Sequence, residues 1–239
     1  MRKRKRKSSN SLLIIYASIF AVISLLYYKY QSPYVYTGEL KIKALPDSFK
    51  SYGIDISHHQ GEIDWSIFKD KVDSTIRFVY CKATEGTNFI DKQWCENRKQ
   101  LQKYKIVHGA YHFFSPKKPA KIQATHFLNQ YSYKQNDLPP VLDSETEGSS
   151  DKELISKMKI WLTEVEEKTG KRPVIYTSYH FYKTKFKLEF PGYKFWIANY
   201  SNTPNRLNHE DIIHWQFSDQ GKIPGIKGNV DLNFSKISF

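Results

Sequence analysis

Residues 139–170, PPVLDSETEGSSDKELISKMKIWLTEVEEKTG, contain the unit on which the predicted fold depends. The unit begins with a short apolar run, PPVLD (139–143), which is typical of a buried strand. A polar loop follows, and then a helix that Ser150 and Glu153 can begin as a capping box. Apolar residues recur at helical spacing along this helix, and Gly170 stands where helices commonly end. A strand that leads through a loop into a helix is the repeating unit of α/β folds with a parallel sheet.

The same alternation recurs on both sides of this unit. Short runs rich in Val, Ile, Phe, Tyr and Trp predict strands at 52–56, 76–82, 106–114, 139–143, 173–177, 194–200, 212–217 and 230–234. Helical patterns at 89–104, 119–132 and 151–170 follow the second, third and fourth strands, whereas the later connections are shorter or irregular. We therefore expect an α/β fold with a mainly parallel sheet closed into a TIM-like barrel, smaller than the usual one.

The N-terminal segments have a composition of their own. Residues 1–11, MRKRKRKSSNS, include six consecutive basic residues, and residues 12–28 carry no charge. The second segment reaches the short end of the length that spans a bilayer, and the positive-inside rule then places residues 1–11 in the cytoplasm. No small-residue cleavage site follows, which favours a transmembrane signal-anchor, while a cleaved signal peptide stays the alternative. Either interpretation places the rest of the chain outside the cytoplasm, anchored at the cell surface or in the periplasm, or secreted after cleavage.

The remainder of the chain divides into a linker and one domain. Residues 29–50 have no sustained period and are predicted to be the linker, and residues 51–239 the domain. The formal charge is +13, but seven of the 37 basic residues and none of the 24 acidic ones lie in the first 30 positions. The domain is thus mildly basic and has no nucleic-acid recognition motif, so we expect no nucleic-acid partner. Cys81 and Cys95 are expected to be buried free thiols, although a location outside the cytoplasm permits a disulfide.

Acidic residues fall near the ends of several predicted strands. Asp55 lies near the end of the first strand, Asp143 ends the fourth, Glu145 follows two positions later, and Asp231 lies in the last strand. Because the carboxyl ends of barrel strands open on one face, we expect these four acids to meet in one cleft. The spacing of Asp143 and Glu145 lets both face one sugar from extended backbone. Two close acids shift each other's pKa values apart, so that one stays protonated, as glycosidic cleavage requires. A plain polar turn before a helix is the alternative for these two residues.

Aromatic residues make up 15% of the chain, and several fall within or at the ends of the predicted strands. Sugar rings pack their apolar faces on aromatic side chains, while polar groups bind the hydroxyls. Core packing explains each of these aromatics taken singly. The candidates for sugar binding, together with one amide near the end of a strand, are Tyr111, Tyr176, Trp196, Tyr200 and Gln216.

Three histidines accompany these candidates. His58 and His59 follow the first strand, and His112 lies in the third. A metal site would need further ligands at set spacing, such as H-E-x-x-H, and the sequence has none. We expect no metal and no cofactor, and both a structural and a chemical role stay open for the three histidines.

Seven segments, taken in order, resemble the family 25 glycoside hydrolases, which are CH-type lysozymes or N-acetylmuramidases. They are GIDISHHQGEIDW, FVYCKATEGTNFID, GAYHFF, PPVLDSE, RPVIYTS, FWIANY and WQFSDQGKIPGIKGNVDLN, and they span about residues 52–235. The resemblance implies a modified barrel, (β/α)5(β)3, in which five β/α units precede three strands that largely lack helices. It also implies hydrolysis of the β-1,4 bond between N-acetylmuramic acid and N-acetylglucosamine, with peptidoglycan glycan strands as the partner.

The resemblance also implies roles for the acids. The catalytic D-x-E pair of the family maps onto Asp143 and Glu145, while Asp55 and Asp231 correspond to two further acids that line the same site. Glu145 would protonate the leaving oxygen and then activate water, and Asp143 would stabilise positive charge on the sugar or on its acetamido group. Tyr176 would hydrogen-bond the acetamido carbonyl.

Other functions stay open at this point. A non-catalytic module that binds wall glycans would keep the fold and the aromatic residues without cleaving a bond. A hydrolase of another N-acetylated glycan, such as chitin, would use the same pair of acids. A metal-dependent deacetylase would lose its activity in a chelator.

Overall fold

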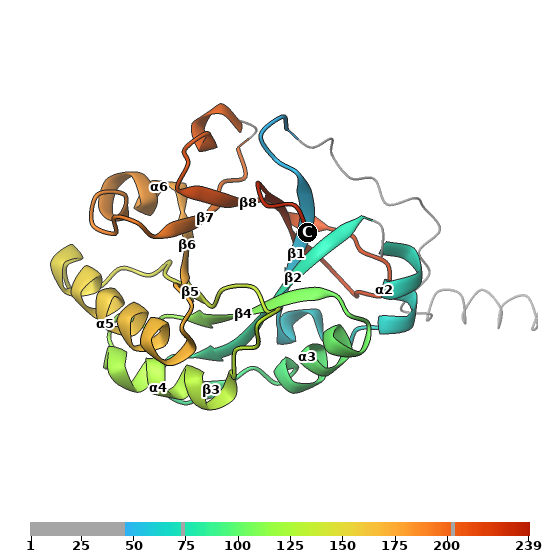
Figure 1. Ribbon diagram of the computed structural model, residues 1–239, viewed down its shortest axis with the longest axis horizontal. Coiled ribbons are helices and arrows are strands. Elements are labelled where there is room, and N and C mark those ends of the chain that lie inside the picture. The colour runs from blue at the N-terminus through green and yellow to red at the C-terminus, as the bar shows by residue number, and fades with distance from the viewer. Residues whose placement is uncertain (1–45, 73–74, 202–203) are drawn as a thin grey trace, which may run out of the picture. The chain divides into compact units, whose positions relative to one another are not determined.

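Within the described residues, eight strands form a closed and mainly parallel barrel (Figure 1). The structure is a computed structural model that describes residues 46–72, 75–201 and 204–239. The barrel strands are β1 (Ser51–Ile56), β2 (Ile76–Glu85), β4 (Val107–Phe113), β5 (Val141–Asp143), β6 (Val174–Ser178), β7 (Lys194–Ala198), β8 (Ile212–Gly221) and β9 (Val230–Ser235). Neighbours from β1 to β8 pair in parallel, which confirms the α/β barrel predicted from the sequence.

The last strand runs in the opposite direction. β9 pairs antiparallel with both β8 and β1, and so closes the barrel. No crossover helix separates β8 from β9, and a direct connection of this kind produces an antiparallel pair. The expectation that every strand ends at the same mouth is therefore wrong for β9. The first residues of β9, including Asp231, lie at the mouth where the parallel strands end.

Helices follow each of the first five barrel strands and lie on the outside of the barrel (Figure 1). They are α2 (Trp65–Val72), α3 (Trp94–Lys103), α4 (Ala120–Gln130), α5 (Asp151–Thr169) and, after β6, the short α6 (Tyr179–Phe181) with the π-helical turn η2 (Tyr182–Phe186). Two short 3-10 helices, η1 (His58–Gln60) and η3 (Pro204–Leu207), lie in loops. This order agrees with the (β/α)5(β)3 arrangement, because the last three strands are joined without a long helix.

The helix predicted over 89–104 begins later than expected. Its first residues form the short strand β3 (Phe89–Ile90), which pairs antiparallel with the end of β2. Asp91 then accepts a hydrogen bond from the backbone N–H of Gln93 (2.9 Å), and the helix α3 starts at Trp94. Helix α2 is an addition that the sequence pattern did not predict. The other two helices begin and end within about two residues of the predicted positions.

Helix α5 shows why the loop before it has a defined conformation. The Ser150 side chain accepts a hydrogen bond from the backbone N–H of Glu153, and Gly170 ends the helix with a φ of 65°. Its apolar face is buried, as predicted, by Leu154, Met158, Trp161, Leu162 and Val165. A capped and docked helix holds the end of the loop that starts at the carboxyl end of β5.

The barrel interior below the mouth is filled mainly by aromatic side chains. Phe78, Tyr80 and Trp196 are almost completely buried there. The Tyr80 and Trp196 rings stack with their centroids 5.0 Å apart, and the buried His214 stacks on Phe78 at 5.2 Å. The interior is therefore closed below these rings, and a ligand can enter from the mouth alone.

Several predictions concern residues at the N-terminal side. The basic segment 1–11, the predicted span 12–28 and the linker up to residue 45 lie outside the described residues. In the described part of the chain, no helix combines the length and the apolar character needed to cross a membrane. Phe49, near the end of the predicted linker, is buried against Trp215 and Phe234.

Both cysteines are free. Cys81 is buried on β2, as expected. The prediction of a buried thiol is wrong for Cys95, which is exposed because it lies on the side of α3 opposite its buried residues Trp94, Asn97 and Leu101.

Candidate active site

A cavity of about 230 Å³ lies at the mouth of the barrel, where the parallel strands end. All nine residues that the sequence predicts for the site line it: Asp55, Tyr111, Asp143, Glu145, Tyr176, Trp196, Tyr200, Gln216 and Asp231. The lining also includes His59, Lys82, Phe113 and Val141, which were not assigned to the site from the sequence. A larger groove on the outer face of α5 contains no aromatic residue and no buried carboxylate. The cavity at the mouth is therefore the better candidate for chemistry.

The extended backbone at the end of β5 aims two acids at this cavity. Asp143 is the last residue of β5, and the backbone of Ser144 still pairs with β6, donating its N–H to the Tyr176 carbonyl (2.9 Å). The Thr177 hydroxyl donates to the Ser144 carbonyl (2.7 Å). Ser144 itself is buried on the helix side, where its hydroxyl contacts the Met158 sulfur. The residues on either side of it therefore share the opposite face, as the period of two predicts.

The acids Asp143 and Glu145 interact closely enough to hold one proton between them. Burial, followed by the charge of Glu145, raises the pKa of Asp143 well above its ordinary value. Burial also raises the pKa of Glu145, while a hydrogen bond with Asp143 and the charge of Lys82 oppose that rise. Asp143 is the donor of this hydrogen bond, and its other oxygen, Oδ1, is buried with no hydrogen-bond partner among the described residues. The pair thus contains a protonated and an ionised carboxyl side by side.

A second pair of acids lies across the cavity. Asp55 on β1 and Asp231 on β9 are direct partners in the antiparallel register, and their carboxyl groups form a hydrogen bond. Burial raises the pKa of Asp55 to about 6. Burial and then the charge of Asp55 raise the pKa of Asp231 to about 9. Near neutral pH this pair holds one proton, which Asp231 donates to the ionised Asp55.

Amide side chains complete the hydrogen bonding of Asp55. Its Oδ2 accepts from Nδ2 of Asn233 (2.7 Å) and from Nε2 of Gln216 (3.0 Å). Asn233 in turn accepts from the indole Nε1 of Trp196 (2.8 Å). Sequence reasoning did not assign Asn233 to the site. Its position two residues after Asp231, on the same face of β9, was the signal that could have identified it.

Gln216 orients two tyrosines at the edge of the cavity. Its Oε1 accepts a hydrogen bond from the hydroxyl of Tyr176 (2.8 Å) and from that of Tyr200 (2.8 Å). Tyr176 and Trp196 are 7% and 1% exposed, so they form the floor, whereas Tyr200 is 55% exposed. Tyr200 is the aromatic candidate that presents a ring face on which a sugar can pack.

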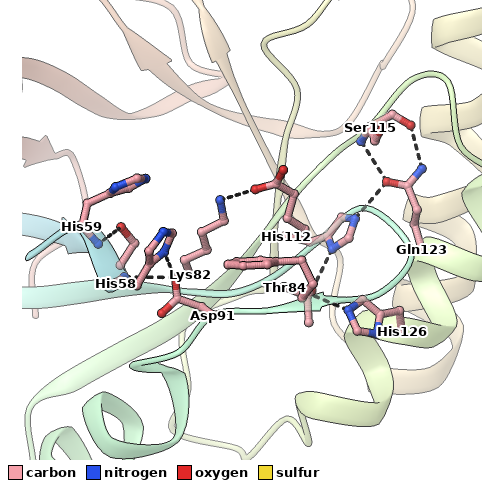
Figure 2. A network of polar contacts seen from close by, with 12 residues as sticks. His58, His59, Lys82, Thr84, Asp91, His112, Ser115, Gln123 and His126 are labelled. Carbon is pink, nitrogen blue, oxygen red and sulfur yellow. Dashed lines mark hydrogen bonds and ion pairs between the residues drawn. The ribbon is translucent and has the colours of Figure 1, made fainter. Parts of the chain in front are cut away.

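Lys82 and His59 line the cavity, although neither was predicted from the sequence to belong to the site. Figure 2 shows both side chains. Lys82 is 7% exposed, and its Nζ donates to Oε2 of Glu85 at 2.7 Å. The His59 ring packs against that of His58 with the centroids 4.1 Å apart and the planes tilted by 35°, and His58 is held by Oδ2 of the buried Asp91 at 2.6 Å. An ionisable residue at the carboxyl end of a predicted barrel strand was the available signal for Lys82.

The third histidine, His112, packs in the core and does not line the cavity. His112 is buried outside the cavity, where it contacts the Thr84 hydroxyl (2.7 Å) and Oε1 of Gln123 (3.2 Å) (Figure 2). Burial lowers its pKa to about 3, so it stays neutral. In the described part of the chain, no group of His, Cys, Asp and Glu side chains has an arrangement that could hold a metal ion.

Known proteins share this sequence and fold. The profile of glycosyl hydrolases family 25 matches residues 54–226. YegX of Escherichia coli strain K12 is 39% identical over 194 residues, which cover 79% of this chain and 71% of that protein. Lysozyme M1 of Streptomyces globisporus is 30% identical over 197 residues, covering 76% and 66%. A family 25 glycosyl hydrolase from Bacillus anthracis superposes with a TM-score of 0.72 and 26% identity, over 85% of this chain and 95% of that one.

Proposed function

Because the chain belongs to the glycosyl hydrolases family 25 and is a glycoside hydrolase, we propose that it cleaves the glycan strands of peptidoglycan. The bond would be the β-1,4 linkage between N-acetylmuramic acid and N-acetylglucosamine. The observation that carries the proposal is the placement of the Asp143–Glu145 pair and the Asp55–Asp231 pair in one cavity. That cavity is bounded by tyrosines that can pack against sugar rings and bind their hydroxyls.

In this reaction Glu145 is the general acid and base. It protonates the glycosidic oxygen as the bond breaks, and it then takes a proton from the attacking water. Asp143 stabilises the positive charge that develops at the anomeric carbon or on the acetamido group that assists. Both roles need carboxyls held in a partly desolvated site, where charges interact more strongly than in water.

The proton must lie on Glu145 before the bond breaks. Without substrate contacts, the hydrogen bond between the two acids places it on Asp143. An N–H donated by the substrate's acetamido group to Asp143 would stabilise that residue as a carboxylate. The proton would then move to Glu145, next to the leaving oxygen. An N-acetylated sugar would in this way prepare the acid that cleaves its own linkage.

The remaining polar groups would position the sugar. The Tyr176 hydroxyl donates its proton to Gln216 and would redirect it to the acetamido carbonyl when the sugar binds. Asp55, held by Gln216 and Asn233, would bind sugar hydroxyls and limit the movement of Asp231. Tyr200 would pack on a ring at the edge of the cavity.

From the sequence we also propose where the enzyme acts. Residues 12–28 would anchor the chain in the membrane, with residues 1–11 in the cytoplasm and the hydrolase domain outside. If the N-terminal segment is instead a cleaved signal peptide, its removal would release the same domain. Fractionation separates the two cases, because an anchored chain stays with the membranes in high salt and carbonate whereas a cleaved one appears in the soluble fraction.

Clearance of purified cell walls tests the catalytic assignment. We expect Glu145→Gln to lose most of the activity, by about 100-fold or more, because amide nitrogen cannot replace the acid. Glu147→Gln is the matched control, since Glu147 lies two residues further along the same loop, has a 63% exposed side chain and pairs with Lys185. Equal clearance by the two variants would remove Glu145 from the acid role. Release of reducing ends from chitin, or of acetate from either glycan, would instead favour the other substrate or a deacetylase.

A further inference from the structure

Lys82 is the one lysine or arginine that lines the active-site cavity among the residues that the structure describes. Its side chain is 8% exposed. Four carboxyl groups share this cavity with it: Asp55, Asp143, Glu145 and Asp231. A buried ammonium group is costly unless it is paired, and this cavity surrounds Lys82 with groups of opposite charge.

The direct partner of Lys82 is an acid outside the cavity lining. Its Nζ donates to Glu85, the last residue of β2, whose side chain is 43% exposed. Figure 2 shows Lys82 and its dashed contact, separate from the buried network of His112 and Gln123. Glu85 therefore holds Lys82 from the solvent side and leaves the acids inside the cavity to interact with it at longer range.

The position of the ammonium group relates it to the catalytic pair. Nζ of Lys82 lies over the Phe113 ring at 4.9 Å from its centroid. Phe113 on β4 is the register partner of Asp143 on β5, and Phe113, Lys82 and Asp143 line the same cavity. The charge of Lys82 favours ionisation of both Asp143 and Glu145. No other described cation lines the cavity to do so.

We propose that Lys82 is a positioning residue that keeps one carboxyl of the Asp143–Glu145 pair ionised, and that Glu85 limits how strongly Lys82 acts. The inference rests on the proposed function, because that reaction needs one proton on the pair and not two. Two protonated acids leave nothing to stabilise the developing positive charge. An unscreened lysine would oppose that positive charge itself, so a partly neutralised lysine serves both requirements.

The other titratable groups that line the cavity are Asp55, His59, Tyr111, Tyr176, Tyr200 and Asp231. Burial raises the pKa of the three tyrosines above the range in which the enzyme would work. Asp55 and Asp231 share a proton, and their pKa values of about 6 and about 9 mean that their charge also acts on the catalytic pair. That contribution is common to the wild type and to the Lys82 and Glu85 variants, so it does not produce a difference between them. His59 also lines the cavity, and His59→Gln tests its contribution directly. We expect that variant to leave the acid limb of the pH profile in place.

The test is the pH dependence of kcat/KM on peptidoglycan for variants of Lys82 and of its partner Glu85. Lys82→Met should move both limbs of the bell-shaped profile upward by about one pH unit, because a nearby opposite charge lowers carboxyl pKa values. Glu85→Gln should move both limbs downward, since it releases the charge of Lys82. Lys82→Arg should retain the wild-type limbs. Lys157→Met is the matched control, because Lys157 makes an ion pair of the same 2.7 Å length outside the cavity.

A readout that does not depend on turnover separates this inference from the proposed function. The 13C shifts of the Asp143 and Glu145 carboxyls, assigned with Asp143→Asn and Glu145→Gln, report their titration directly. The midpoints should rise in Lys82→Met and fall in Glu85→Gln. Unchanged midpoints in both variants, or a Lys82→Met profile that is lower at every pH with its limbs unmoved, would overturn the inference even if the wild type cleaves peptidoglycan. Shifted midpoints in an enzyme that releases no muramic-acid product would instead reject the function and keep the electrostatic role.

Discussion

Asp55 and Asp231 lie directly opposite each other on β1 and β9, and their carboxyl groups share a hydrogen bond although 175 residues separate them in the chain. The antiparallel direction of β9 makes this possible, because it brings the beginning of that strand to the mouth. A parallel β9 would have placed the residues at its beginning at the closed end. The direction of one strand thus decides whether the fourth acid belongs to the site.

The shared proton of this pair predicts that stability falls with pH on the alkaline side of neutrality. The pKa of Asp231 is raised from 3.8 to about 9, so the folded chain binds a proton that the unfolded chain releases. Stability therefore decreases as the pH rises from 7 to 9. Asp231→Asn keeps a hydrogen-bond donor for Asp55 without a titrating group. Thermal unfolding should show a smaller loss of Tm over this range in that variant, and an identical loss in both proteins would contradict the shared proton.

We expect the buried His214 to make stability depend on pH in the opposite sense in acid. Neither of its ring nitrogens has a hydrogen-bond partner in the described part of the chain, and burial lowers its pKa to about 3. The unfolded chain binds a proton below pH 6.5 and the folded chain does not, so stability is lost as the pH falls from 6.5 toward 3. His214→Leu should raise the Tm at pH 4.5 by roughly 5 °C. The exposed His180→Gln is the control, and an equal response of the two variants would remove His214 as the cause.

We expect substitution of Asn233 to cause a large loss of stability. It donates to Asp55 and accepts from Trp196, and all three side chains are buried. Asn233→Leu leaves an indole N–H and a carboxylate without this partner, which costs about 2–4 kcal/mol in the free energy of unfolding. Urea denaturation measures this. Asn229→Ala, at an exposed position where the side chain bonds to Gln220, should change the free energy by less than about 0.5 kcal/mol. A small effect at both positions would show that the amide network is dispensable.

We expect removal of the Tyr200 ring to weaken substrate binding. Its ring is 55% exposed at the edge of the cavity, and its hydroxyl is fixed by Gln216. Tyr200→Ala removes the ring and should raise KM by roughly tenfold with a smaller change in kcat, because packing against a bound sugar acts in the ground state and the transition state alike. Tyr200→Phe keeps the ring and should stay close to the wild type in KM. If the phenylalanine variant loses as much as the alanine variant, the hydroxyl and not the ring face provides the binding.

Much of this site could be predicted because its residues lie at or near the ends of strands that have strong sequence patterns. Asp143 follows an apolar run directly, and Asp55 lies one residue before the end of a short strand, so the barrel topology brings both to one rim. Lys82 and Asn233 were not predicted to belong to the site, for a different reason. A strand pattern shows that a residue faces inward, but the register between strands decides which acid it meets. That register depends on contacts between segments distant in the chain, such as Phe113 beside Asp143.

One difference in the fold has the same physical origin. The start of the predicted helix at 89 was displaced by pairing of Phe89 and Ile90 with the end of β2, so a tertiary contact overrides what the local pattern indicates. Trp196 lines the cavity, and its contacts with Tyr80 and with Asn233 on β9 likewise depend on the register between strands.

Mass spectrometry of the soluble products from intact peptidoglycan tests the central claim most directly. We expect fragments whose new reducing end is N-acetylmuramic acid, released by the wild type and by Glu147→Gln and nearly absent with Glu145→Gln. Fragments that end in reducing N-acetylglucosamine, products that have lost acetyl groups without chain cleavage, or equal release by the Glu145 variant would contradict it.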